Sequence, residues 1–330
     1  MQYTTIGHSR LRVSRVAFGC MSTVANPTYQ GVAEAQGIAA IRCAVDAGIN
    51  FFDTAPGYGD GASEALLGRA VKDIRDDVVI ADKINTATLS AEDVTNECEK
   101  SLKRLQTDRI DLYQIHWPKN VVPIDETLRA MEQLVEDGKV RELGVCNFGP
   151  IDLGNAISTG VKLATNQIAY SLLSRAVEYE VSGQCEEAGL KLLCYSPVAQ
   201  GLLADKFRSA DDVPESRART RIFSGERREA RHGEAGCEPE AFEAVSAVRE
   251  IAEGLGHPMA DVALAWLLHQ TAVGCVLAGA STEEQVKQNA AAADIHLSPE
   301  VLDDLDAATA TVKSRLGTSL DMWASPSRIR

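Results

Sequence analysis

The feature of this sequence that most constrains its fold is a regular alternation of short apolar segments and amphipathic segments. Eight runs rich in apolar and β-branched residues have the length of strands and lie at 15–20, 50–54, 77–83, 109–116, 140–146, 164–169, 191–196 and 274–279. Amphipathic stretches with helical spacing lie between them, among them 34–47, 63–72, 90–105, 124–136, 177–188 and 260–269. Strands that alternate with helices form a parallel sheet, and near-continuous apolar strands indicate that both of its faces are covered.

Closure of this sheet into a barrel is favoured by the positions of the unusual polar residues. Nearly all of them stand at the carboxyl end of a predicted strand, where barrel enzymes assemble their active sites. The 330 residues are enough for one barrel of roughly 250 residues with added loops. We therefore predict an α/β fold in which residues 1–330 form a single (β/α)8 TIM barrel domain.

Two polar segments interrupt the alternation. Residues 198–238 follow the seventh strand as a long insertion, and loops of this length in compact domains are usually functional or disordered. Its arginines either supply charge to a site or form a solvated surface, the interpretation we favour; they are Arg208, Arg217, Arg219, Arg221, Arg227, Arg228 and Arg231. The tail after Ala310, which contains Trp323, is irregular and is expected to cover the barrel mouth. Together with loops 23–31 and 117–123, these segments are expected to determine the substrate.

The composition argues against several classes of partner. The net charge of −14 and the pI near 4.9 disfavour nucleic acids and anionic membranes, because both are polyanions. The N-terminus lacks the features of a signal peptide, and no apolar run approaches the roughly 20 residues that span a bilayer. The eight cysteines include no CxxC pair and no zinc-site spacing. We interpret them as reduced thiols and predict a cytoplasmic protein without a metal.

Four chemically active side chains follow neighbouring predicted strands. Asp53 ends the second strand and Tyr58 lies in the turn after it, while Lys83 ends the third strand and His116 the fourth. Each residue alone has an ordinary interpretation as a turn, packing, solvated or structural residue. In a barrel, however, the ends of these strands are neighbours. The four residues are therefore candidate catalytic residues.

This combination of groups suits the reduction of a carbonyl group. A phenol has a pKa of about 10, which a nearby ammonium lowers, and a buried carboxylate keeps that ammonium charged and oriented. A histidine beside them can hold the carbonyl oxygen. Such a site polarises the carbonyl and protonates the alkoxide as hydride arrives from a nicotinamide cofactor, and it oxidises an alcohol in reverse.

Several segments around these residues resemble the aldo-keto reductase superfamily. They are 5–14 (TIGHSRLRVS, like its first hairpin), 53–59 (DTAPGYG) with 63–68 (SEALLG), 111–118 (DLYQIHWP) and 144–148 (GVCNF). The similarity extends from about residue 3 to about residue 310. The segment 196–203 (SPVAQGLL) is closer to microbial members and to the potassium-channel β-subunit branch than to mammalian aldose reductases. The resemblance thus implies a barrel with an N-terminal β-hairpin.

The resemblance also implies a role for each candidate residue. It makes Asp53, Tyr58, Lys83 and His116 a catalytic tetrad in which Tyr58 is the general acid or base. It assigns further residues to the cofactor. Asn147 and Gln167 would hold the nicotinamide carboxamide, and Tyr195, with Ser196 after it, would stack on the nicotinamide ring. The adenosine end would lie on segment 278–289, at Gly279, Ser281, Gln285, Gln288 and Asn289.

Three departures from the usual family pattern stand out. Cys146 replaces a serine beside the carboxamide, which weakens or removes one hydrogen bond to the cofactor. Asp82 precedes Lys83 where a hydroxyl residue is commoner, and strand alternation is expected to turn it away from the site. Ser281 and Gln285 stand where members that prefer NADPH often have Lys or Arg, and they bind a phosphate less decisively. We still favour NADP(H) over NAD(H).

Three functions are compatible with these residues. The first is an NAD(P)H-dependent reductase of small-molecule aldehydes or ketones, sugar-derived compounds included, or the reverse alcohol oxidation. The second is a cofactor-binding regulatory subunit with slow turnover. The third, a lyase that forms a Schiff base on Lys83, leaves Asn147, Gln167 and Tyr195 without a role.

Overall fold

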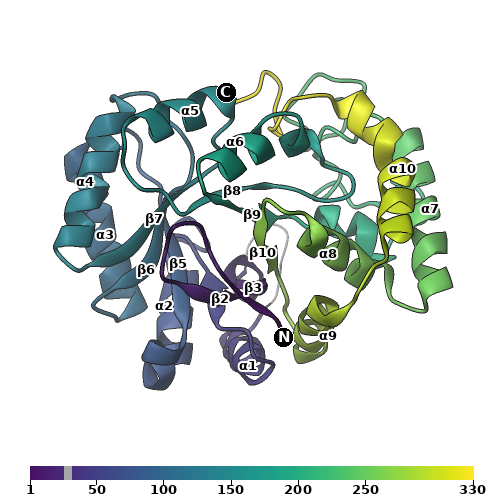
Figure 1. Ribbon diagram of the computed structural model, residues 1–330. Helices are drawn as coiled ribbons and strands as arrows, with labels where there is room; N and C mark the ends of the chain where they lie inside the picture. The colour runs from purple at the N-terminus through teal and green to yellow at the C-terminus, as the bar shows by residue number, and fades with distance from the viewer. Residues whose placement is uncertain (26–31) are drawn as a thin grey trace.

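The barrel predicted from the alternation is present. The computed structural model describes residues 1–25 and 32–330, and their eight parallel strands close in the order β10-β3-β4-β5-β6-β7-β8-β9 (Figure 1). The strands are β3 (Val16–Gly19), β4 (Phe51–Asp53), β5 (Val79–Ile84), β6 (Ile110–Ile115), β7 (Val140–Cys146), β8 (Thr165–Ala169), β9 (Lys191–Tyr195) and β10 (Val273–Ala278). Every strand therefore lies within two residues of its predicted limits.

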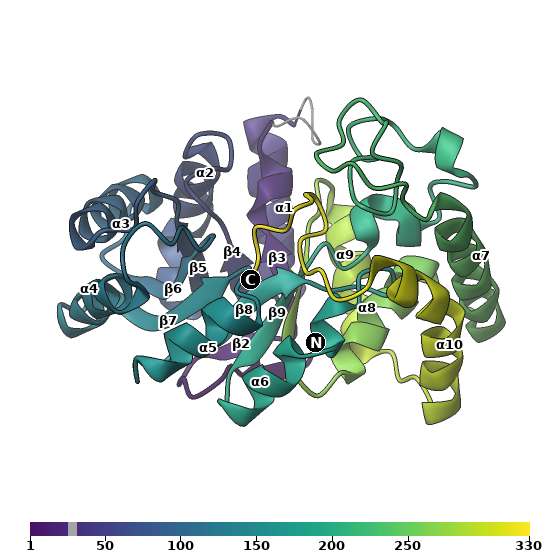
Figure 2. The ribbon, with the colours of Figure 1, turned by 90° about the horizontal axis from the view of Figure 1, so that it is seen from above.

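Helices surround the barrel on its outer side (Figures 1 and 2). They are α1 (Glu34–Asp46), α2 (Ala62–Val71), α3 (Ala91–Leu105), α4 (Ile124–Glu136), α5 (Pro150–Ser158), α6 (Val181–Glu187), α7 (Glu238–Leu255), α8 (Met259–His269), α9 (Glu283–Ala291) and α10 (Pro299–Leu316). Local signals fix several of their ends. The Ser90 hydroxyl accepts from Asp93 N at the start of α3, and Gly138, Gly160 and Gly189 follow α4, α5 and α6 with φ of +74°, +77° and +70°.

Two apolar cores hold these layers together. The larger lies between the strands and the helices, and the smaller fills the barrel interior with residues such as Phe51 and Leu112. The N-terminal hairpin, β1 (Tyr3–Thr5) and β2 (Arg12–Ser14), contributes to the inner core. Its residues Ile6, Leu11 and Val13 are buried against that core. The hairpin implied by the family resemblance is thus present, and it packs into the barrel interior.

The structure corrects the prediction in two places. The stretch 177–188 contains a short 3-10 helix (Ala176–Glu178) and then α6, instead of one helix. The irregular tail begins only after Leu316, because α10 continues with Leu305, Thr309 and Val312 buried at helical spacing. Loop 198–238 includes two 3-10 helices (Ala199–Ala204 and Ala210–Asp212). Of loop 23–31, residues 26–31 lie outside the described residues.

The tail crosses the carboxyl end of the barrel, as predicted. Figures 1 and 2 show it running from α10 towards the start of α5. The backbone oxygen of Arg330 accepts from Ile151 N and Asp152 N, both at 3.1 Å, and its guanidinium lies 2.7 Å from Asp152 Oδ1. Asp321 is buried within the tail and accepts hydrogen bonds from Trp323 N and Arg328. These contacts hold the tail in place.

Within residues 1–25 and 32–330, no helix is long and apolar enough to cross a membrane. The same residues contain no group of three His, Cys, Asp or Glu side chains arranged to hold a metal ion. All eight cysteines are buried and free.

Candidate active site

The carboxyl ends of the strands open into a cavity of about 520 Å³. Twelve of the fourteen predicted site residues line it: Asp53, Tyr58, His116, Asn147, Gln167, Tyr195, Ser196, Gly279, Ser281, Gln285, Gln288 and Asn289. The other two, Lys83 and Cys146, are buried and do not reach its surface. A larger surface hollow of about 720 Å³ lies between residues 118–125 and α5, but it contains none of the fourteen.

Lys83 connects the acidic and phenolic groups of the site. Its Nζ donates to Asp53 Oδ1 at 2.6 Å, to the Thr54 carbonyl at 2.8 Å and to the Tyr58 hydroxyl at 3.3 Å. Because Lys83 donates to the phenolic oxygen, the Tyr58 proton remains available for a ligand in the cavity. The ammonium is fully buried and off the cavity surface, so Lys83 is poorly placed to form a Schiff base with a substrate.

The net pKa of Tyr58 differs from our expectation of a lowered value. Burial raises it to about 12, against a lowering by Lys83 and with a further rise from Asp53. Burial acts to lower the pKa of Lys83, but Asp53 and then Tyr58 raise it above its usual value. The site therefore holds a charged ammonium beside a protonated phenol at neutral pH.

His116 packs against Tyr58, with the two rings edge-on and their centroids 6.1 Å apart. Burial, followed by the charges of Lys83 and Lys119, lowers the pKa of His116 to about 3. The imidazole is therefore neutral at physiological pH. Its Nδ1 is buried without a hydrogen-bond partner among the described residues, which leaves Nε2 to contact a ligand oxygen.

The side chains predicted to hold a nicotinamide form a connected group. Gln167 Nε2 donates to Asp53 Oδ2 at 2.7 Å, and its amide oxygen remains able to accept. The Tyr195 hydroxyl donates to Asn147 Oδ1 at 2.9 Å, and Asn147 Nδ2 donates to the His116 carbonyl at 3.0 Å. Ser196 Oγ accepts from Gln200 Nε2 at 3.0 Å. These bonds fix the amides and the Tyr195 ring before any ligand binds.

Two of the sequence departures lie behind the cavity. The Cys146 thiol is buried, and burial raises its pKa. Asp82 is also buried, and its Oδ1 accepts from Lys83 N at 2.8 Å. Burial and then the Glu64 carboxylate raise the pKa of Asp82 well above its usual range. Because Glu64 belongs to α2, Asp82 lies on the side of β5 that faces the helices. This position agrees with our expectation that Asp82 faces away from the site.

The other end of the cavity is formed by the turn from β10 to α9. Gln285 Oε1 accepts from Ser281 N at 2.9 Å, and Thr282 caps α9 by accepting from Gln285 N. The first turn of α9 carries Glu283 and Glu284, which oppose the attraction of a helix start for anions. The positive charge that a phosphate needs must therefore come from elsewhere.

The arginines of loop 198–238 divide into three groups. Arg221 and Arg227 are paired with Glu234 and Glu238, and the side chains of Arg208 and Arg228 are largely exposed; Arg231 is exposed as well. Arg217 and Arg219 line the cavity. A solvated surface, the interpretation we favoured, thus describes only part of the loop.

Sequence reasoning also missed Lys206, Trp117 and Met21, which line the same cavity, as does the tail residue Trp323. No local pattern marked Lys206, because its position depends on how the loop folds back over the barrel. Trp117 was a weak signal, since it directly follows His116.

With the site described, comparison with known proteins identifies the family. Residues 15–310 match the Aldo/keto reductase family. The chain belongs to this family. It is 33% identical over 302 residues to aldo-keto reductase YhdN of Bacillus subtilis, with 87% of each chain covered.

Two further relatives of this aldo/keto reductase are named for different functions. A probable voltage-gated potassium channel subunit β from Oryza sativa is 31% identical, covering 93% of this chain and 96% of its own. An NADH-specific methylglyoxal reductase from Escherichia coli is 30% identical, covering 90% of this chain and 95% of its own.

A solved structure is similar as well. The crystal structure of an aldo/keto reductase from Klebsiella pneumoniae with NADP and acetate is 31% identical and covers 92% of this chain and 94% of its own, with a TM-score of 0.73. The predicted family and fold are confirmed.

Proposed function

We propose that this aldo/keto reductase reduces a small aldehyde or ketone, sugar-derived compounds included, with Tyr58 as the general acid. The observation that carries the proposal is the contact between Lys83 Nζ and the Tyr58 hydroxyl in a cavity that His116 also lines. A protonated phenol, a buried cation and a neutral imidazole are the groups that a developing alkoxide requires.

The steps assigned to these residues follow from their positions. A bound nicotinamide supplies the hydride. His116 Nε2 and the Tyr58 hydroxyl orient the carbonyl oxygen of the substrate. As negative charge develops on that oxygen, Tyr58 transfers its proton, and the charged Lys83 stabilises the phenolate that remains. Asp53 holds Lys83 in place by accepting a hydrogen bond from its Nζ.

Several residues of the cavity support the binding of a nicotinamide adenine dinucleotide. Gln167 and Asn147 offer amide groups for the carboxamide, and the ring of Tyr195 offers a flat face for the nicotinamide. Burial lowers the pKa of Lys206, and the nearby charge of Arg217 lowers it further. Both side chains line the cavity, and neither has an acidic partner among the described residues. Two neighbouring unpaired cations suit the cofactor's phosphates, and we propose NADP(H) ahead of NAD(H) on this ground.

The pH dependence of each direction tests the assignment of Tyr58. We expect kcat/KM for reduction to stay constant between about pH 5 and 9, because His116 is neutral above its pKa of about 3 and Tyr58 is protonated below about 12. Oxidation of the alcohol requires the phenolate, so its rate should rise about tenfold per pH unit across this range. Both profiles are measured at saturating cofactor. A reduction rate that fell steeply through neutral pH would contradict the assignment.

Replacing Gln285 with Arg tests where the adenosine end binds. Gln285 lines the cavity in the first turn of α9, so a guanidinium there would reach a 2′-phosphate. We expect the ratio of kcat/KM with NADPH to that with NADH to rise about tenfold, the effect of one charge-assisted hydrogen bond. Gln285→Met is the control, because it removes the bond to Ser281 N without adding charge. An equal ratio in both variants would show that this turn does not bind the adenosine end.

A regulatory subunit with slow turnover is the second candidate, and the Oryza sativa relative is the observation that favours it. The two functions differ in the fate of bound NADPH. A reductase oxidises it within seconds of aldehyde addition and continues to turn over, whereas a regulatory subunit retains it. Stopped-flow fluorescence of the bound cofactor distinguishes them.

A further inference from the structure

Arg219 is a cation of the cavity wall that the reaction described above does not use. It comes from loop 198–238 and lines the same cavity as Tyr58 and His116. Among the described residues, its guanidinium has no hydrogen bond and no ion pair, and its Nε is buried without a partner. Resting on the proposed function, we propose that Arg219 binds an ionised group on the carbonyl substrate, so that carboxylate-bearing aldehydes and ketones are preferred over neutral ones of the same shape.

The other buried arginines of the loop show what Arg219 lacks. Arg221 Nε lies 2.9 Å from Glu234, and Arg227 Nη2 lies 3.0 Å from Glu238. Glu229 is the acid whose charge acts on Arg219, but among the described residues it forms no ion pair with that guanidinium. Burial lowers the pKa of Arg219, Arg231 lowers it further, and Glu229 only partly opposes them. A partly buried guanidinium without an acidic partner is stabilised when an anion binds to it.

The contacts of Arg219 place it at the reactive end of the cavity. Its guanidinium carbon lies 5.1 Å from the ring centroid of Trp323, which itself lines the cavity. Burial raises the pKa of the Tyr195 hydroxyl, but Trp323 lies close enough to lower it in part, and that hydroxyl donates to Asn147. One side chain, Trp323, therefore lies between Arg219 and Tyr195, whose ring is proposed to face the nicotinamide. The contact with the indole holds one side of the guanidinium, and its N–H groups have no other partner among the described residues, so they can donate to a carboxylate.

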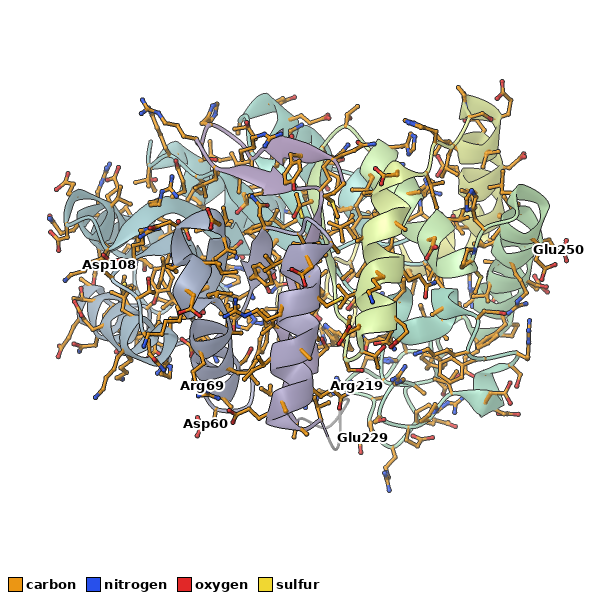
Figure 3. The ribbon with its side chains drawn as sticks, turned by 90° about the horizontal axis from the view of Figure 1, so that it is seen from below. Asp60, Arg69, Asp108, Arg219, Glu229 and Glu250 are labelled. Carbon is orange, nitrogen blue, oxygen red and sulfur yellow. The ribbon has the colours of Figure 1, made fainter. Side chains whose placement is uncertain are left out.

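The view of the side chains agrees with this position. Figure 3 shows Arg219 on the same side of the molecule as Asp60 and Glu229, both of which lie in loops that follow barrel strands. Two other cations line the cavity, Lys206 and Arg217, and both are proposed to bind the cofactor's phosphates. The other titratable groups of the site do not oppose an anionic substrate. Asp53 is paired with Lys83, and His116 is neutral. An anion that enters this end thus meets a cation and no free carboxylate among the described lining residues.

The test compares anionic and neutral aldehydes of matched shape. We use 4-carboxybenzaldehyde with 4-carbamoylbenzaldehyde, and adipic semialdehyde with its methyl ester. The readout is the ratio of kcat/KM for the anionic member to that for the neutral one. We expect this ratio to be about 10 or more in the native protein and to fall about 10- to 100-fold in Arg219→Met, as for the loss of one charge-assisted hydrogen bond. Arg219→Lys, which keeps the charge but loses the planar fork, should lie between them.

Matched controls separate this inference from other effects. Arg228→Met removes an arginine of the same loop whose side chain is 79% exposed, and its ratio should equal that of the native protein. Circular dichroism and thermal melting establish that each variant is folded. An unchanged ratio for both substrate pairs in Arg219→Met would overturn the inference. If the Kd for NADPH were also weaker in that variant, the result would indicate that Arg219 binds a cofactor phosphate instead.

The two proposals can fail separately. If the native protein reduced none of the four aldehydes with either cofactor, the proposed function would be wrong. The binding of benzoate and benzamide to the protein with NADP⁺, measured by calorimetry, then decides the inference alone. A preference for benzoate that Arg219→Met abolishes supports the anion site, and equal binding of the two ligands rejects it.

Discussion

Replacing Tyr58 with Phe is expected to lower kcat for carbonyl reduction by about 10²- to 10⁴-fold, the usual contribution of a general acid. The change removes the phenolic proton and leaves the ring, which packs at the edge of His116. The site loses its proton donor, because Lys83 is held by Asp53 and the Thr54 carbonyl and lies behind the cavity surface. Steady-state and single-turnover kinetics with one aldehyde measure the loss.

The specificity of this result depends on two controls. The Kd for NADPH, followed by fluorescence, should change by less than about twofold, since an effect confined to the transition state leaves ground-state binding intact. Tyr113→Phe makes the same chemical change at a buried tyrosine of β6 whose hydroxyl has no partner among the described residues, and it should leave kcat near the native value. Turnover that survived in Tyr58→Phe would mean that another group donates the proton.

The barrel and the convergence of the candidate catalytic residues were predictable from the sequence for local reasons. Strands buried on both faces need continuous apolar runs, so residues such as 140–146 could be delimited without any tertiary information. Polar residues at the ends of those runs then had to share one end of the barrel. Asp53, Lys83 and His116 needed nothing more than this argument to be brought together.

Other features of the site depend on long-range contacts that leave no local pattern. Trp323 reaches the cavity because the tail is folded around Asp321 and held at its end by Asp152, which is far away in the sequence. Arg219 and Lys206 reach it only through the path of loop 198–238. These positions are set by packing between segments, and composition alone suggested a solvated surface.

The pKa of Tyr58 was mispredicted for a related reason. The presence of a neighbouring ammonium can be read from the sequence, but the extent of burial cannot. Burial has the larger effect here, so the pKa is raised to about 12 in spite of Lys83. In the proposed mechanism, Lys83 is therefore important chiefly when the phenolate forms, after proton transfer.

Replacing Lys83 with Met is expected to lower both stability and turnover, and a second substitution should separate the two effects. Lys83 is fully buried and lies 2.6 Å from Asp53, which is only 3% exposed, so removing the ammonium leaves a buried carboxylate without its counter-charge. Breaking a buried pair in this way costs about 3–5 kcal/mol in the free energy of unfolding. Urea denaturation at neutral pH measures this cost.

The double variant Lys83→Met, Asp53→Asn removes both charges and retains an amide that can hydrogen-bond to Gln167, which donates to Asp53 in the native protein. We expect it to recover most of the lost stability, because a neutral pair of similar volume avoids the cost of burying an unpaired charge. It should not recover turnover, since no cation remains to stabilise the Tyr58 phenolate. Recovery of both properties would show that Lys83 serves only to neutralise Asp53. A stability loss that persisted in the double variant would instead indicate that the hydrogen bond from Lys83 Nζ to the Thr54 carbonyl matters, because methionine keeps the volume of the lysine stem but cannot donate to that oxygen.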